Sequence, residues 1–165
     1  MSENSDVDFA ILVYREEDRW EADVLPVAVT DDFEGFLNVL RQQPSIGGTI
    51  GFAGIADDAF LAVRVVGAQV SALLSDLLAG ATYPLARQVL DFLDIEVPDT
   101  DDVDQVLPVG DMSIFADLGL DEMELAMISG DLDQYPDDVT HEIRDILASQ
   151  AMAAHDSGIP GAGRR

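Results

Sequence analysis

The residue types that perform chemistry are scarce in this chain, and their spacing does not suit a catalytic site. Among 165 residues there are two histidines and no cysteine, which excludes thiol nucleophiles and thiolate metal sites. His141 and Glu142 resemble the start of a zinc-binding helix, but Asp145 occupies the position of the second histidine. A serine nucleophile needs a neighbouring base, and His141 is the only candidate outside the C-terminal tail. We therefore predict no enzymatic activity, no metal and no cofactor, and we expect His141 to be a solvated surface residue.

Two further motifs fail for specific reasons. Asp131, Asp133 and Glu142 match three positions of a calcium-binding loop, but Pro136 stands where that loop needs glycine. The glycine-rich stretch 47–51 lacks the lysine and the following serine or threonine of a phosphate-binding loop, and it leads into a strand instead of following one. We interpret these glycines as a tight turn or a close approach of the backbone.

The stretch 117–122 resembles the prosthetic-group attachment site of an acyl carrier protein. The modified serine of that site corresponds here to Glu122, so no phosphopantetheine can be attached. The same residues predict a helix capped by Asp121, with Leu118 and Leu120 pointing inward.

The charge of the chain narrows the classes of partner. There are 33 acidic residues and 8 basic ones, all arginine, for a net charge of −25. Between Arg87 and Arg144 there are 17 Asp and Glu residues and no Lys or Arg. Phosphate contacts require clustered cations, so direct nucleic-acid binding is excluded and docking on an anionic membrane is disfavoured.

The sequence also predicts a cytoplasmic protein. No apolar run approaches the roughly 20 residues of a membrane-spanning helix. The first six residues are polar and acidic, unlike the start of a signal peptide.

The first 97 residues are typical of an α+β fold. The stretch 7–14 is apolar on both faces, as expected for a central strand. A second strand over 20–29 contains Pro26, which favours a sheet edge. The remaining expected elements are a helix at 32–42, strands at 48–55, 60–66 and 70–75, and a helix at 83–93. The order is β-β-α-β-β-β-α, an antiparallel sheet of about five strands, as in profilin-like, longin and roadblock-type domains, which mostly act as interaction platforms.

Details of these elements are less strongly specified. Residues 70–78 have the period of a helix, yet a short turn precedes them, and we predict a strand. Asp31 and Asp32 provide an N-cap and a first-turn acid for the helix at 32–42. Thr82 is the expected N-cap of the helix at 83–93, whose inner face we assign as follows: Leu85, Val89, Phe92 and Leu93.

The remainder of the chain is acidic and helical. We expect a linker over 98–110, a helical segment over 111–154 packed on the sheet, and a disordered tail over 155–165. Helices begin at Asp121 and at Pro136, and Gly130 ends the first of them. Ile114, Phe115, Leu118 and Leu120 are too apolar for a linker, so we expect them to be largely buried.

Two longer stretches resemble the signature segments of the actinobacterial tRNA adenosine deaminase-associated proteins. The first segment is 41–51 and the second segment is 111–125, and the resemblance extends from about residue 8 to residue 146. Members of that family are named for gene proximity to the deaminase, and the family has no established activity. The residues that carry the resemblance, and that could form an interface, are Arg41, Gln42, Gln43, Pro44, Ser45, Gly47, Gly48, Ser113, Phe115, Asp117, Gly119, Asp121 and Glu122.

The resemblance implies a partner of the deaminase and not the enzyme itself. The deaminase reaction needs zinc, His and Cys ligands and a glutamate acid–base, and this chain has no cysteine and no His-x-Glu motif. One hypothesis is therefore an acidic, non-catalytic partner or regulator. The alternatives are an interaction platform that forms a homodimer through its sheet, and acidity that serves solubility alone.

Overall fold

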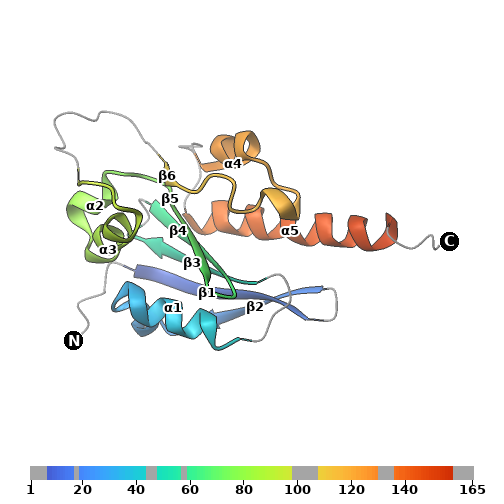
Figure 1. Ribbon diagram of the computed structural model, residues 1–165, viewed down its shortest axis with the longest axis horizontal. Helices are drawn as coiled ribbons and strands as arrows, with labels where there is room; N and C mark the ends of the chain where they lie inside the picture. Colours follow the sequence, from blue (N-terminus) through green and yellow to red (C-terminus); the bar gives the residue numbers. More distant parts are fainter. Residues whose placement is uncertain are drawn as a thin grey trace.

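The computed structural model describes residues 7–16, 19–43, 48–56, 59–97, 108–129 and 136–157. Within them, six strands form an antiparallel sheet in the order β2-β1-β3-β4-β5-β6 (Figure 1). The strands are β1 (Val7–Glu16), β2 (Arg19–Leu25), β3 (Thr49–Ile55), β4 (Ala59–Val66), β5 (Gln69–Leu74) and β6 (Val109–Gly110). The two-faced apolar strand β1 lies inside the sheet and β2 lies at its edge, as predicted.

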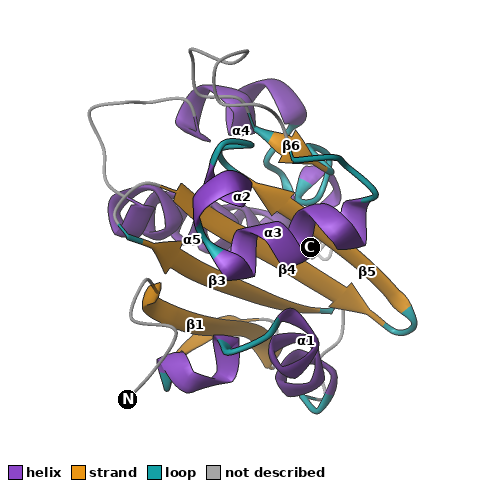
Figure 2. Cartoon of the chain, turned by 90° about the vertical axis from the view of Figure 1, so that its left-hand side faces the viewer, coloured by secondary structure: helices purple, strands orange, loops and turns teal. Residues whose placement is uncertain are grey.

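The helices cover the two faces of this sheet. They are α1 (Phe33–Arg41), α2 (Ala79–Thr82), α3 (Pro84–Leu93), α4 (Glu122–Ser129) and α5 (Pro136–Ser157), with short 3-10 helices at Val27–Thr30 and Ala116–Leu118. Figure 1 shows α1 below β1 and α5 above β1 and β2, extending to the right, and Figure 2 shows α2 and α3 in front of the sheet. None of the described helices is long and apolar enough to cross a membrane.

Each face of the sheet contributes to its own apolar core, because successive residues of a strand point to opposite sides. On the first face, α1 and α3 pack on strand residues that include Leu12, Ala53, Leu61, Val63 and Leu74. On the second face, the second segment and α5 pack on Val13, Ile50, Phe52, Phe60 and Leu73. The first 97 residues therefore build five of the six strands and cover one face, and the C-terminal residues add β6 and cover the other face.

Several local predictions are confirmed. Residues 69–74 form the strand β5, because the tight turn at Gly67, with φ of 60°, returns the chain along β4. Asp121 Oδ1 accepts a hydrogen bond from the Glu124 amide at 2.8 Å, as an N-cap does. Pro84 and Pro136 are the first residues of α3 and α5.

Other boundaries were predicted incorrectly. β2 ends at Leu25 instead of residue 29, since the Pro26 carbonyl begins a 3-10 turn that the Thr30 hydroxyl supports by donating to the Val27 carbonyl at 2.6 Å. The helix at 32–42 is capped by Asp32, whose Oδ1 accepts from the Gly35 amide at 2.6 Å. Asp31 instead ends the preceding turn, and Glu34 is the acid in the first turn of the helix.

The second helix of the sheet region also differs from the prediction. Thr82 ends α2, and Tyr83 is the N-cap of α3 without a side-chain hydrogen bond. Ala86 and Leu90 join the buried face of α3, whereas Phe92 is 43% exposed and rests on Phe33 with ring centroids 5.3 Å apart. The sequence pattern predicts Phe92 on the inner face because this residue is apolar, and that prediction is wrong.

The C-terminal half contains two further differences. Val109 and Gly110 lie in the range predicted as linker, but they pair with Leu74 and Leu73 as a sixth strand. The α5 helix continues through Ser157, past the predicted start of the tail at 155, because Gly158 is the first strong helix breaker after Pro136. Asp131 and Asp133 of the rejected calcium-loop motif, the predicted helix end at 130, the predicted linker at 98–107 and the predicted tail at 158–165 lie outside the described residues.

Candidate functional site

Short polar side chains fix the backbone of the second segment. Asp111 Oδ1 accepts hydrogen bonds from the Ser113 amide at 3.0 Å and from the Ser113 hydroxyl at 2.6 Å, which closes a tight turn. Gly119 has φ of 102°, which ends the 3-10 turn Ala116–Leu118 before Asp121 caps α4. The resemblance residues Ser113, Gly119 and Asp121 thus act first on local structure.

Apolar side chains anchor the same segment to the sheet. Phe115 is completely buried and its ring centroid lies 6.0 Å from that of Phe52 on β3. Ile114 and Leu120 are buried beside it, and Leu118 is partly buried against the same core. The predicted burial is therefore confirmed at three positions and partial at the fourth.

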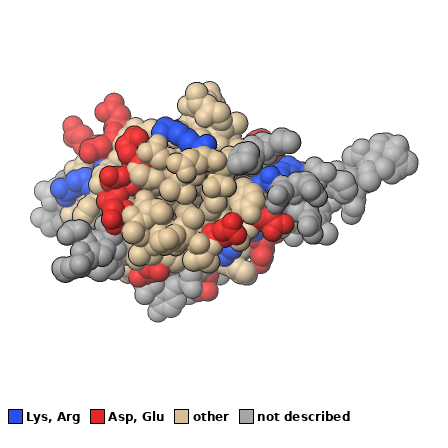
Figure 3. Space-filling view, turned by 90° about the horizontal axis from the view of Figure 1, so that it is seen from below, with Lys and Arg blue, Asp and Glu red and all other residues tan. Residues whose placement is uncertain are grey.

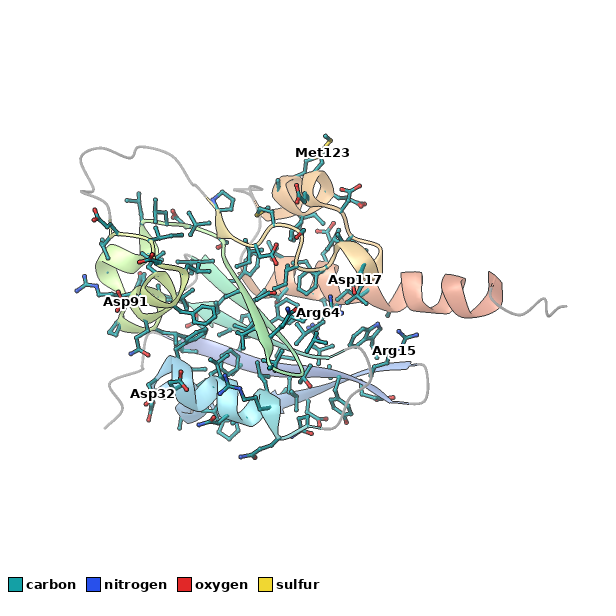
Figure 4. All side chains as sticks on the ribbon, in the orientation of Figure 1. Arg15, Asp32, Arg64, Asp91, Asp117 and Met123 are labelled. Atoms are coloured by element: carbon teal, nitrogen blue, oxygen red, sulfur yellow. The ribbon has the colours of Figure 1, made fainter. Side chains whose placement is uncertain are left out.

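An arginine of the sheet forms hydrogen bonds with the second segment. Arg64 lies on β4, is 8% exposed, and points to the second face of the sheet. Its Nη1 donates to Asp117 Oδ1 at 2.5 Å and to the Ile114 carbonyl at 3.0 Å, and its Nη2 donates to Asp117 Oδ2 at 3.1 Å. Figure 4 shows Arg64 and Asp117 pointing toward one another at the centre of the molecule.

This two-point pairing alters the carboxyl group. The hydrogen bonds and the positive charge of Arg64 lower the pKa of Asp117 below its usual value, against the opposing effect of partial burial. Asp117 remains ionised as far as moderately acidic pH, and the two parallel hydrogen bonds fix its orientation. We call this pair the Arg64–Asp117 clamp.

Sequence reasoning missed Arg64, although a signal was present. Arg64 is the one charged residue in the apolar strand Ala59–Val66, and a charged residue in a buried strand must find a partner. The partner could not be named, because Asp117 lies 53 residues further along the chain.

A polar groove of about 340 Å³ lies beside the clamp. Its lining residues are Arg64, Val66, Gln69, Ser71, Asp111, Ser113, Ile114 and Asp117. None of the described residues that line this groove is a histidine, so neither Ser71 nor Ser113 has an imidazole base among them, and Arg64 is already bound to a carboxylate. The groove can donate and accept hydrogen bonds, and the carboxylate beside its Ser113 hydroxyl is that of Asp111, which closes the local turn.

A second groove, of about 460 Å³, lies between α1 and α3. Phe33 and Phe92 form its apolar wall, and Asp32, Glu34, Gln88 and Asp91 complete its lining. Gln88 Oε1 accepts a hydrogen bond from the Phe33 amide at 2.6 Å, so this residue joins the two helices. Asp32 and Asp91 both lie on this side of the molecule (Figure 4), so the described lining supplies carboxylates without a hydroxyl or amine nucleophile beside them.

The first segment lies at the connection between α1 and β3. Arg41 ends α1 and is partly exposed. Its Nη1 lies 3.9 Å from Glu34 Oε1. Gln42 follows as the exposed C-cap, and Gln43 is half-buried. Pro44, Ser45 and Gly47 lie outside the described residues.

Gly48 connects this segment to the end of β4. Its φ is 99°, and a Cβ placed there would lie 2.6 Å from Val66 Cγ2 and 2.8 Å from the Val65 carbonyl oxygen. The first segment therefore meets β4 within two residues of Arg64, whereas Arg41 and Gln42 are on the α1 side. The structure does not bring all the predicted interface residues to one patch.

The outer surfaces of the two faces differ in charge. Along the second segment and α4, the residues Asp117, Asp121, Glu122 and Glu124 are exposed, and no Lys or Arg occurs between Arg87 and Arg144. On the side where α1 lies, arginines and acids occur together, with a broad uncharged area between them (Figure 3). His141 on α5 is exposed, as predicted, and its Nε2 lies 3.4 Å from Asp145 Oδ2.

Metal binding has no support among the residues that the structure describes. No group of three His, Asp or Glu side chains lies close enough there to hold an ion.

The chain matches a known family over a range that includes the two segments and the clamp. Residues 8–149 match the Rv3753c-like tRNA adenosine deaminase-associated protein family, a range that includes both segments, Arg64 and Asp117. The chain belongs to this family. It is also 33% identical over 132 residues to Protein Rv3753c of Mycobacterium tuberculosis, covering 79% of this chain and 76% of the relative. No solved structure matches the chain.

Proposed function

We propose that this family member is a non-catalytic, cytoplasmic partner of a tRNA adenosine deaminase, and that it contacts the enzyme through its acidic C-terminal face. The family description supports the association with a deaminase. The observation that carries the mode of binding is the stretch of 17 acidic residues without a single Lys or Arg between Arg87 and Arg144.

A tRNA-binding enzyme presents basic residues to the phosphate backbone of its substrate. An acidic surface attracts such a protein over long range and raises the association rate. On this face four acids of one short stretch, Asp117, Asp121, Glu122 and Glu124, are exposed, and the Arg64–Asp117 clamp fixes the segment that presents them. The acids are thus held on an ordered surface.

The absence of enzymatic machinery in the grooves supports a binding role. Among the described lining residues of the two grooves there is no histidine beside a hydroxyl, and the chain has no cysteine for the zinc site of a nucleobase deaminase. The protein would therefore act on the deaminase as a regulator or carrier and would not share its chemistry.

The test is co-elution of the two purified proteins in size-exclusion chromatography at about 50 mM and about 500 mM salt. The screening length falls about threefold over this range, so we expect a complex at low salt that dissociates at high salt. A complex that co-elutes equally at both salt concentrations would indicate an apolar interface. Absence of a complex at both concentrations would contradict the proposal and favour acidity that serves solubility alone.

One observation favours a second candidate, a dimerisation platform. β2 is an edge strand of seven residues, and no described strand pairs with its outer side. Its Val24 is 83% exposed, which suits strand-to-strand association. A molar mass of two chains by light scattering, reduced to one chain by Val24→Lys, would support it. A single chain at all concentrations would contradict it.

A further inference from the structure

The helix α4 is apolar on two opposite sides. Its Leu125 is completely buried and Ile128 is partly buried against the second face of the sheet. Met123 and Met127 point the other way and are 75% and 72% exposed. Figure 4 shows Met123 projecting from the outer side of the helix. Among the described residues, only the inner side of α4 packs on the sheet, and the outer methionines belong to neither apolar core.

These two methionines form a continuous patch. They are four residues apart on one helix, so their side chains are neighbours on its surface. The other large apolar side chains that the structure exposes are Val24, Val66, Phe92 and Val97, each on a different element or connection. Methionine is flexible and polarisable, and it is favoured on surfaces that adapt to helical partners.

Acidic side chains flank the patch at the start of α4 and restrict what can cover it. Asp121, Glu122 and Glu124 are all exposed on the first turn of α4 and next to it. A second copy of this chain would bring another net charge of −25 against the patch, and this repulsion opposes self-association. An amphipathic helix with apolar residues on one side and Lys or Arg along its edges would complement both the methionines and the acids.

We infer that the outer side of α4, formed by Met123 and Met127 with Glu122 and Glu124, is the docking surface for a basic amphipathic helix of a partner protein. The inference rests on the proposed function only for the identity of the natural partner. The patch itself is small, so the contact is of the transient kind, with the methionines as its anchors.

The first measurement locates the contact. The protein is labelled with ¹³C in its five methionine methyl groups and titrated with a synthetic Leu/Lys helix of about 18 residues, or about five turns. The methyl signals of Met123 and Met127 should shift together, whereas the signal of the partly buried Met112 should stay in place. Shifts confined to other methionines, or no shift at saturation of binding, would overturn the inference.

The second measurement separates the apolar anchors from charge. The variant M123S/M127S should bind the peptide at least tenfold more weakly, since two buried methionine contacts are lost. The matched control V24S/F92S removes two exposed apolar side chains elsewhere and should bind as the unmodified chain does. Equal affinity of the methionine variant and the unmodified chain would show that charge alone attracts the peptide, which contradicts the docking surface.

The third measurement compares two variants in which acidic residues are neutralised. E122Q/E124Q should weaken binding several-fold, and the control D23N/E34Q, which neutralises the same number of acids on β2 and α1, should have a smaller effect. All six substituted acids and methionines are exposed, so each variant should unfold at the same temperature as the unmodified chain. Equal effects of the two charge variants would contradict recognition at α4.

The same variants distinguish this inference from the proposed function. If the peptide binds at α4 but a purified tRNA adenosine deaminase binds nowhere, the proposed function fails and the docking surface stands. If the deaminase binds M123S/M127S as tightly as it binds the unmodified chain, the proposed function stands and α4 is not its docking surface.

Discussion

The two faces of the sheet have similar interiors and different exteriors. On the first face α1 and α3 bury Phe36, Leu37 and Leu90, and on the second face the C-terminal residues bury Phe115 and Ile143. On the outside, the first face mixes arginines with acids (Figure 3), whereas along the second segment and α4 the exposed charged side chains are all acidic and the exposed large apolar ones are Met123 and Met127.

This difference separates what stabilises the protein from what its surface can bind. Apolar packing holds both faces, so packing does not explain why the second face is so acidic. The second face has in addition a buried cation, Arg64, whose two hydrogen bonds fix Asp117 in the segment that leads to α4. An acidic surface that is held this way is suited to present charge to a partner.

The largest expected effect tests whether the two faces form one cooperative unit. Phe36→Ala and Phe115→Ala each remove a fully buried ring, and each should lower the free energy of unfolding by about 3–5 kcal/mol. Urea denaturation followed by circular dichroism should show one transition for both variants. A separate early transition for Phe115→Ala would mean that the C-terminal face unfolds alone.

The clamp should matter more than an exposed ion pair. Arg64→Ala removes a buried cation with three hydrogen bonds and should cost about 2–3 kcal/mol of stability. Arg41→Ala removes a partly exposed partner of Glu34 on the first face and should change stability by less than about 0.5 kcal/mol. Equal urea midpoints for the two variants would contradict the clamp.

Glycine substitutions test the point where the first segment meets β4. Gly48→Ala forces a Cβ into Val65 and Val66 at a positive φ, and it should cost about 1–3 kcal/mol. Gly67→Ala also has a positive φ but has no atom within 4 Å of its Cβ, so its cost should be smaller. Thermal unfolding of the two variants gives the comparison, and a larger loss at Gly67 would contradict it.

The smallest expected effect is the pH dependence of the clamp. Because the pKa of Asp117 is lowered in the folded protein, its contribution to stability is complete above the unfolded pKa of about 3.9 and is lost as the pH falls through the folded value. The stability difference between the unmodified chain and Asp117→Asn should be below about 1 kcal/mol at neutral pH and should vanish at acidic pH.

The control for this prediction is the same substitution in an Arg64→Ala background. Without the guanidinium, Asp117→Asn should have a much smaller effect at every pH. A pH-dependent difference that persists without Arg64 would assign the lowered pKa to another group.

The sequence was sufficient for the features that depend on neighbouring residues. Runs of apolar residues predicted the strands, and the cap at Asp121 and the prolines at 84 and 136 marked helix starts. The choice between strand and helix at 70–78 was decided by pairing of β5 with β4, which a helical period does not reveal.

The features that depend on contacts between residues far apart in the chain could not be predicted from the sequence. The partner of Arg64 is 53 residues away, and β6 is a strand only because Asp111 and its neighbours lie against β5. Phe92 is apolar yet exposed, since Leu90 occupies the inner position. The exposed methionines of α4 became a candidate surface only when Leu125 was placed inside.

The most direct test of the acidic-face account is hydrogen exchange of this protein with and without a purified tRNA adenosine deaminase at low salt. Binding through the second face should slow the exchange of amides between Asp111 and Ser129, and leave those of α1 and α3 unchanged. Slowed exchange on α1 and α3, with none between Asp111 and Ser129, would contradict the account.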